Sequence, residues 1–119
     1  MKRLCNATLN SARAFRHLAK NETAFQQELL LLTVAIPAAW IIAPTWRSYG
    51  LLVGVVLFVM IVEVLNTAVE AACNALTRDF NEHIRLAKDC GSLAVSISLI
   101  IMIVVWAMAL WEWWSGSLG

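Results

Sequence analysis

The chain has 119 residues, of which 61% are hydrophobic and 14% are charged, and its formal net charge is +1. An ordinary soluble domain carries about 25% charged residues, so this composition argues against a water-soluble protein and indicates one small membrane domain. The near-neutral charge also argues against a nucleic-acid partner, because phosphate binding needs a clustered excess of basic residues. We therefore predict an all-α membrane protein with a single domain over residues 1–119.

The first predicted element is an amphipathic helix near the N-terminus. Residues 6–20 place apolar side chains at helical spacing and basic side chains on other faces. This pattern is typical of a helix that lies on an anionic membrane surface. An ordinary helix packed on the protein's own core would show the same pattern. We expect residues 1–28 to form this helix and the turn after it.

Three apolar segments follow, and each is expected to cross the membrane as a helix. The first, residues 29–46, is just long enough at about 1.5 Å per residue to cross a bilayer core of ~30 Å, and Pro44 is expected to end it. The second, residues 49–76, is too long for one crossing, so its last part should continue as a helix beyond the core. The third, residues 90–114, has no charged residue before Glu112.

The distribution of basic residues predicts the orientation of the chain. Five of the nine lie before the first apolar segment, and three more lie in the loop 77–89. By the positive-inside rule, these two regions should be cytoplasmic, with residues 44–50 and the C-terminus outside. The tryptophans should form a belt that lies mostly at the outer side of the membrane, at Trp40, Trp46, Trp106, Trp111, Trp113 and Trp114.

The stretch IVEVLNTAVEAACNAL, residues 61–76, carries carboxylates in an apolar helix. Glu63 and Glu70 are seven residues apart, so they fall within about 20° of each other and about 10 Å apart along one helix face, which Asn66 shares. A carboxylate at membrane depth costs ~3 kcal/mol or more unless it is paired, hydrated or protonated, and it therefore indicates a functional site. The competing interpretation is a pair of ion-pair partners that hold helices together.

Other charged residues are expected to meet this face. Glu22 and Glu28 lie around the turn NETAFQQE, and Lys88 and Asp89 lie in RLAKDCGS. Carboxylates gathered without His or Cys suit Mg²⁺, which is usually held by one or two protein carboxylates together with substrate phosphates. A remaining carboxylate can accept a proton from a hydroxyl group.

On the strings NETAFQQE, MIVEVLNTAVEA and AKDCGSLAV, in this order, the chain resembles the small prokaryotic diacylglycerol kinases of the Gram-negative type. The resemblance covers nearly the whole chain. It implies a homotrimeric, multi-pass enzyme of the bacterial inner membrane, with its active site on the cytoplasmic side among membrane lipids. It also implies transfer of the γ-phosphoryl group of MgATP to the hydroxyl of diacylglycerol, which yields phosphatidic acid.

The resemblance assigns roles to residues that match the family's motifs. It makes Glu63 the general base, and Glu22 and Glu70 the ligands of Mg²⁺. The positions that it implies for ATP binding are Arg3, Asn10, Glu22, Glu70, Asp79, Phe80, Asn81, Lys88 and Asp89. The positions that it implies for the lipid substrate and the organisation of its site are Glu28, Glu63, Asn66 and Ser92.

The sequence departs from the family's pattern at three positions and leaves alternatives open. Asn10 stands where an aromatic residue is frequent, Asn74 where aspartate is usual and Asn81 where histidine is common, and these departures bear on nucleotide preference. C-G-S after A-K-D favours diacylglycerol over the undecaprenol substrate of related Gram-positive kinases. A small multidrug-type transporter would need a fourth span, and a structural membrane subunit would not need buried carboxylates on one face.

Overall fold

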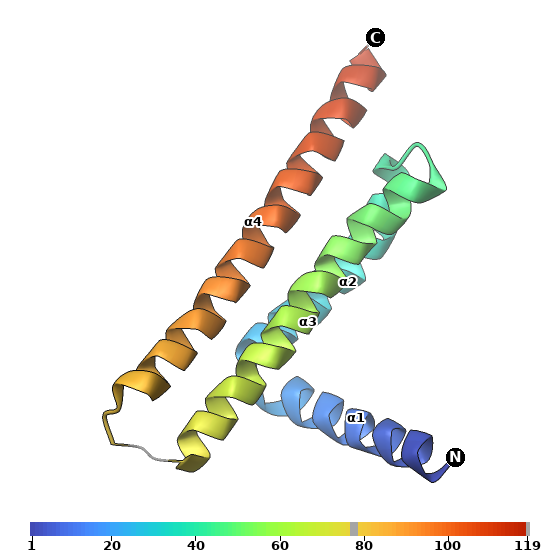
Figure 1. Cartoon of the computed structure of the whole chain (residues 1–119). Helices are drawn as coiled ribbons and strands as arrows, with labels where there is room; N and C mark the ends of the chain where they lie inside the picture. The colour runs from blue at the N-terminus through green and yellow to red at the C-terminus, as the bar shows by residue number, and fades with distance from the viewer. Residues whose placement is uncertain (77–78, 119) are drawn as a thin grey trace.

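All secondary structure in the described part of the chain is helical, which confirms the all-α class (Figure 1). The computed structural model describes residues 1–76 and 79–118. Thr77 and Arg78, which open the predicted loop 77–89, lie outside the described residues. The helices are α1 (Lys2–Asn21), α2 (Thr23–Ile42), α3 (Trp46–Leu76) and α4 (Glu82–Leu118).

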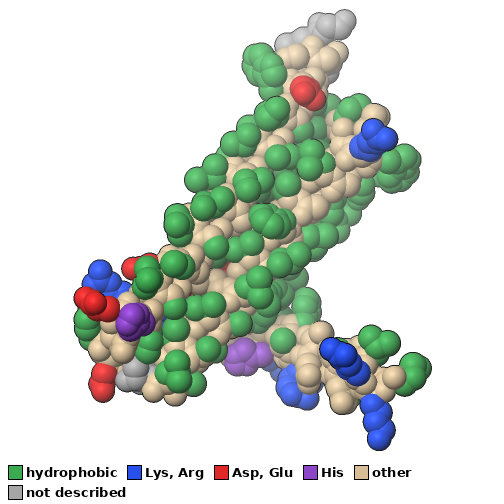
Figure 2. Space-filling model, viewed as in Figure 1, with side chains coloured by type: hydrophobic (Ala, Val, Ile, Leu, Met, Phe, Trp, Pro, Cys, Tyr) green, Lys and Arg blue, Asp and Glu red, His purple; other side chains and the backbone are tan. Residues whose placement is uncertain are grey.

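Three of the helices are long and apolar enough to cross a membrane, as predicted. They are α2, α3 and α4 over Glu82–Gly116. Hydrophobic side chains cover the shaft that these helices form, and most charged side chains lie toward its ends or on α1 (Figure 2). No fourth helix of this kind occurs in residues 1–76 and 79–118, so the transporter interpretation lacks the span that it requires.

The turn between α2 and α3 is shifted toward the N-terminus relative to the prediction. Ala43 is extended (φ −72°, ψ 125°), as expected for a residue before proline, so α2 ends at Ile42 ahead of Pro44. The hydroxyl of Thr45 accepts a hydrogen bond from the backbone N–H of Ser48 at 3.1 Å. This N-cap contact starts α3 at residue 46, three residues earlier than expected.

The largest difference from the prediction lies before the third span. Residues 82–89 were expected in a loop, but they form the first two turns of α4, so this part of the prediction was wrong. The side-chain oxygen of Asn81 accepts hydrogen bonds from the backbone N–H groups of His83 (2.9 Å) and Ile84 (3.2 Å). This N-cap supplies acceptors for donors that have no partner within the helix, and it therefore fixes the start of α4.

Helix α3 is the centre of the fold, because it packs against both α2 and α4, whereas α2 and α4 barely touch. Leu52, Val56 and Val59 of α3 are fully buried between them. The indole N–H of Trp106 on α4 donates a hydrogen bond to the backbone carbonyl of Leu52 at 3.0 Å. Over residues 82–116, Ser98 is the one buried side chain of α4, and the apolar residues that face α3 are half-buried, so most of that helix's apolar surface is uncovered.

Helix α1 joins the bundle only near its C-terminus (Figure 1). Leu18 is its one buried residue, and it forms a small core with Phe25 of α2 and Met60 of α3. The rings of Phe15 and Phe25 meet edge to face, with centroids 5.6 Å apart. Apart from the half-buried Ala19, the remainder of α1 is exposed, and its placement on a membrane surface stays a prediction.

The two ends of the bundle differ in chemistry. At one end, which we call the aromatic end, Trp40, Trp46 and Tyr49 form a mutual edge-to-face cluster beside the C-terminal turns of α4. At the other end, which we call the carboxylate end, lie the start of α2, the last turns of α3 and the start of α4 (Figure 1). The predicted site residues of these three helices lie at the carboxylate end.

Candidate active site

The central part of the site is one face of α3. The Asn66 side chain is buried, and its amide nitrogen lies 3.4 Å from Oε1 of Glu70, one helical turn further on. Glu63 is half-buried, and its charge interacts with that of Glu70. The face predicted from the spacing of these three residues is therefore present in the structure.

Two carboxylates from outside α3 approach this face. Glu28 of α2 is 9% exposed, and its charge interacts with that of Glu63. Its Oε1 atom is buried and has no hydrogen-bond partner among the described residues. Such an atom in a spanning helix costs free energy unless something pairs with it, so it points to a role beyond packing.

Glu22 occupies the break between α1 and α2. Its backbone is extended (φ −104°, ψ 112°), and this break allows the chain to turn from α1 into α2. The N–H of Glu22 donates to the carbonyl of Leu18 (2.9 Å), and the carbonyl of Glu22 accepts from the N–H of Gln26 (3.0 Å). These bonds fix the backbone of Glu22, and the charge of its side chain interacts with that of Glu63.

The start of α4 closes the site from the other side of α3. The ammonium group of Lys88 donates a hydrogen bond to the side-chain oxygen of Asn74 at 2.8 Å. One turn further along α4, Gly91 lies directly against the Asn66 side chain. Asp89 forms an exposed ion pair with Arg85, with 3.9 Å between Nε and Oδ2. Lys88 is thus held beside the carboxylate face, whereas Asp89 is engaged on the surface of its own helix.

The carboxylate end has a donor set that fits Mg²⁺. Its ligand candidates are the carboxylates of Glu22 and Glu70, whose charges both act on Glu63. In residues 1–76 and 79–118 no three His, Cys, Asp or Glu side chains are grouped closely enough to hold a metal by themselves. Two carboxylates completed by substrate phosphates are the usual arrangement for Mg²⁺, and that arrangement does not need such a group.

Two predicted nucleotide-site residues lie far from this face within one copy of the chain. Arg3 and Asn10 are exposed residues of α1. They precede Glu22 by 19 and 12 residues, so at 1.5 Å per residue they lie roughly 28 Å and 18 Å from it along the helix axis. A single copy does not bring them to Glu63.

The remaining predicted residues lie on α4 or just before it. Phe80 is exposed, and the guanidinium of Arg85 lies over its ring at 5.9 Å from the centroid. The side-chain oxygen of Asn81 caps α4, which is a structural role that the sequence interpretation did not include. Asp79 and Ser92 are exposed.

The structure adds two residues that the sequence prediction did not place in the site, namely Asn74 and Gly91. Asn74 contacts a side chain 14 positions away, and Gly91 faces a residue 25 positions earlier in the chain. A single sequence holds no periodic pattern that would pair residues at such separations. The capping of α4 by Asn81, in contrast, could have been predicted from the sequence, because an Asn directly before a helix-forming stretch is a recognisable N-cap pattern.

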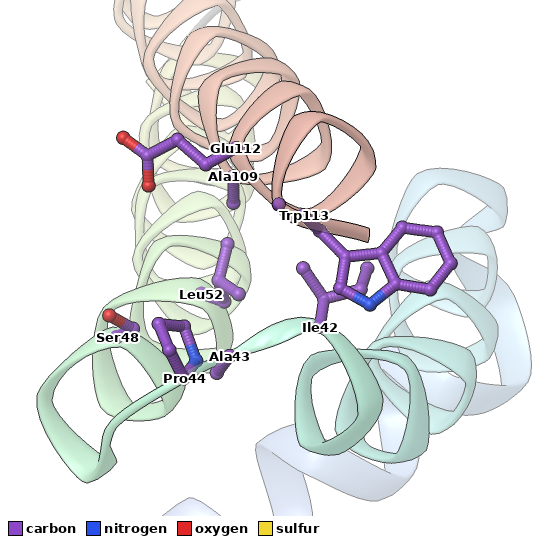
Figure 3. Close-up of a pocket in the computed structure, with 9 residues that line it drawn as sticks. Ile42, Ala43, Pro44, Ser48, Leu52, Ala109, Glu112 and Trp113 are labelled. Atoms are coloured by element: carbon purple, nitrogen blue, oxygen red, sulfur yellow. The ribbon is translucent and has the colours of Figure 1, made fainter. Parts of the chain in front are cut away.

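A separate cavity lies at the opposite end of the bundle. It has a volume of about 370 Å³ and is lined by residues of the α2–α3 turn and the last turns of α4 (Figure 3). Glu112 is its one charged lining residue, and its carboxylate points away from the ring of Trp113. Because this cavity is at the aromatic end, it does not belong to the carboxylate site.

The fold and the site together define a multi-pass helical membrane protein with interacting carboxylates at one end of its bundle. Residues 9–110 match the family model described as prokaryotic diacylglycerol kinase. The chain is 36% identical over 110 residues to the diacylglycerol kinase of Pseudomonas aeruginosa, covering 92% of this chain and 89% of the relative. It is likewise 36% identical over 110 residues to that of Escherichia coli K12 (92% and 90%) and 37% identical over 103 residues to that of Haemophilus influenzae (87% and 87%). The chain therefore belongs to the prokaryotic diacylglycerol kinase family and is an integral membrane kinase, so the resemblance noted from the three strings is confirmed.

Proposed function

We propose that this protein is a lipid kinase that transfers the γ-phosphoryl group of ATP to the hydroxyl of diacylglycerol and yields phosphatidic acid. The observation that carries the proposal is the position of Glu63, half-buried in a spanning helix and within electrostatic reach of Glu28 and Glu70. Charged residues in such helices usually mark a site of function. Family membership, with relatives named diacylglycerol kinase, supports the choice of substrate.

Glu63 is the proposed general base. Its carboxylate accepts the proton of the lipid hydroxyl as the hydroxyl oxygen forms a bond to the γ-phosphorus. The bond from that phosphorus to the β–γ bridging oxygen breaks, and ADP leaves. Such a reaction depends mainly on positioning and on neutralising phosphate charge, so it needs no covalent intermediate with the protein.

Glu22 and Glu70 are the proposed ligands of Mg²⁺, which when bound neutralises charge on the phosphates. Lys88 adds a positive charge on the α4 side, where Asn74 accepts its hydrogen bond without neutralising it. The other residues proposed for the nucleotide are Arg3, Asn10, Asp79, Phe80, Asn81 and Asp89. The residues proposed to organise the lipid side of the site are Glu28, Asn66 and Ser92.

A homotrimer is the proposed assembly, in the inner membrane with the carboxylate end toward the cytoplasm. Most of the apolar surface of α4 is uncovered, which gives a second copy a large surface to pack on. A neighbouring copy is also our proposed source for groups such as Arg3 and Asn10, which one copy leaves far from Glu63. The concentration of basic residues in α1 and around residues 78–88 supports the cytoplasmic placement.

The test is a transfer assay with purified protein in lipid nanodiscs. ATP labelled in its γ-phosphoryl group is supplied with Mg²⁺ and either diacylglycerol or undecaprenol. We expect label in phosphatidic acid, and none when the metal is chelated. Label in undecaprenyl phosphate alone would replace the proposed substrate by the alternative of the same family, and label in no lipid would refute the kinase proposal.

A further inference from the structure

Gly91 differs from the other glycines that the structure describes. A Cβ atom built on Gly91 would overlap Oδ1 of Asn66 and would lie 3.2 Å from its Cγ. A Cβ built on Gly50, Gly54 or Gly116 would meet nothing within 4 Å. Among the described glycines, Gly91 is therefore the one whose lack of a side chain is required by a neighbour, because α4 passes the buried amide of Asn66 there.

The orientation of that amide follows from its two neighbours. An ionised carboxylate can only accept hydrogen bonds, so the NH₂ group of Asn66 must face Glu70. Its oxygen must then face α4, where it is buried and has no hydrogen-bond partner among the described residues. The amide occupies a slot with a carboxylate on one side and the bare backbone of Gly91 on the other.

We infer that Gly91 is a positioning residue, which keeps the amide of Asn66 turned toward Glu70 by leaving the space that its oxygen occupies. A methyl group at residue 91 would force the amide to rotate or the two helices to separate. Either change would break the 3.4 Å contact with Glu70 and leave that carboxylate free to turn. The link from this geometry to turnover rests on the proposed function, in which Glu70 holds Mg²⁺.

The test compares Gly91→Ala with Gly54→Ala. Both replace a glycine in a helix by alanine, so both gain the same helix propensity, but only the first meets a neighbour. We expect Gly91→Ala to raise the Mg²⁺ concentration for half-maximal activity and to lower kcat at least tenfold, because small misplacements in a site cost up to about 10²-fold. Gly54→Ala should match the unsubstituted protein.

A double-substitution cycle isolates the route through Asn66. In an Asn66→Ala background the overlap is gone, so adding Gly91→Ala should leave kcat unchanged and should raise thermal stability only by the gain in helix propensity that Gly54→Ala shows. An equal loss from Gly91→Ala in both backgrounds would overturn the inference, because residue 91 would then act on helix packing alone. If Gly91→Ala does not fold, recovery of folding in the double variant would support the inference and continued misfolding would overturn it.

A readout that does not need turnover separates this inference from the proposed function. The side-chain amide NMR signal of Asn66, in ¹⁵N-labelled protein, should shift in Gly91→Ala and stay unchanged in Gly54→Ala. If the unsubstituted protein phosphorylates no lipid, the proposed function fails, and the NMR comparison still decides the role of Gly91. An unchanged Asn66 signal in Gly91→Ala would overturn the inference whatever the activity.

Discussion

Replacing the half-buried carboxylate Glu63 by its amide should abolish most turnover without harming the fold. Glu63→Gln keeps the size of the side chain but removes a group that can accept a proton. General-base catalysis typically contributes about 10²–10⁴-fold, which at 1.36 kcal/mol per tenfold raises the barrier by about 3–5 kcal/mol. The substitution also removes one negative charge from a position that interacts with Glu22, Glu28 and Glu70. Repulsion among these carboxylates should decrease, so thermal stability should hold or rise while kcat falls.

The assay measures kcat, MgATP binding and thermal unfolding on the same preparation in nanodiscs. Glu112→Gln is the matched control, because Glu112 is an exposed carboxylate at the aromatic end and should tolerate the change (Figure 3). Glu63→Asp should lose less than Glu63→Gln, since it keeps the base and only misplaces it. Turnover near that of the unsubstituted protein in Glu63→Gln, with normal nucleotide binding, would show that the base is another group, and Asp89 would be tested next.

Three further predictions concern the metal, the nucleotide and the topology. Glu22→Gln or Glu70→Gln should lower activity at least tenfold at a fixed Mg²⁺ concentration while the oligomer persists in cross-linking, and full activity of either variant would exclude that residue as a ligand. Asn74→Ala removes the acceptor that holds the Lys88 ammonium at 2.8 Å, so the KM for ATP should rise about three- to tenfold with a smaller change in kcat, given roughly 1 kcal/mol for such a hydrogen bond. An unchanged KM would show that Lys88 is not positioned by that bond. A reporter inserted at Asn81 should lie in the cytoplasm and one fused to the C-terminus should lie outside, and finding both on the same side would contradict the three-span topology.

The helices were predictable where periodicity and composition determine them. The three long apolar segments correctly predicted three long apolar helices. The seven-residue spacing of Glu63 and Glu70 correctly predicted a shared helix face, because α3 continues unbroken to Leu76. The start of α4 was not predicted, because the charged stretch after Asn81 has the composition of a surface loop. The side chain of Asn81 caps its first turn, and hydropathy does not detect such a cap.

The contacts between helices could not be predicted from one sequence. Nothing in the order of residues states that Gly91 faces Asn66 or that Lys88 reaches Asn74, since these pairs depend on how far α4 is shifted along α3. That shift is set by packing of the whole helix pair, including the Trp106 contact with Leu52 at the far end. The charged residues of the site could therefore be predicted from the sequence, whereas the uncharged residues Asn74 and Gly91 could not.

The gathering of the tryptophans at one end of the bundle determines which changes intrinsic fluorescence can detect in this protein. All six tryptophans lie in the α2–α3 turn region or in α4 from Trp106 onward, whereas Glu70 lies 18 residues beyond Leu52, roughly 27 Å further along α3. Intrinsic fluorescence will therefore follow melting or detergent contact at the aromatic end and will be nearly insensitive to a nucleotide at the other end. The native tryptophans can be replaced by phenylalanine and Phe80, which is exposed, by tryptophan (Phe80→Trp). This change would move the fluorescent probe to the carboxylate end.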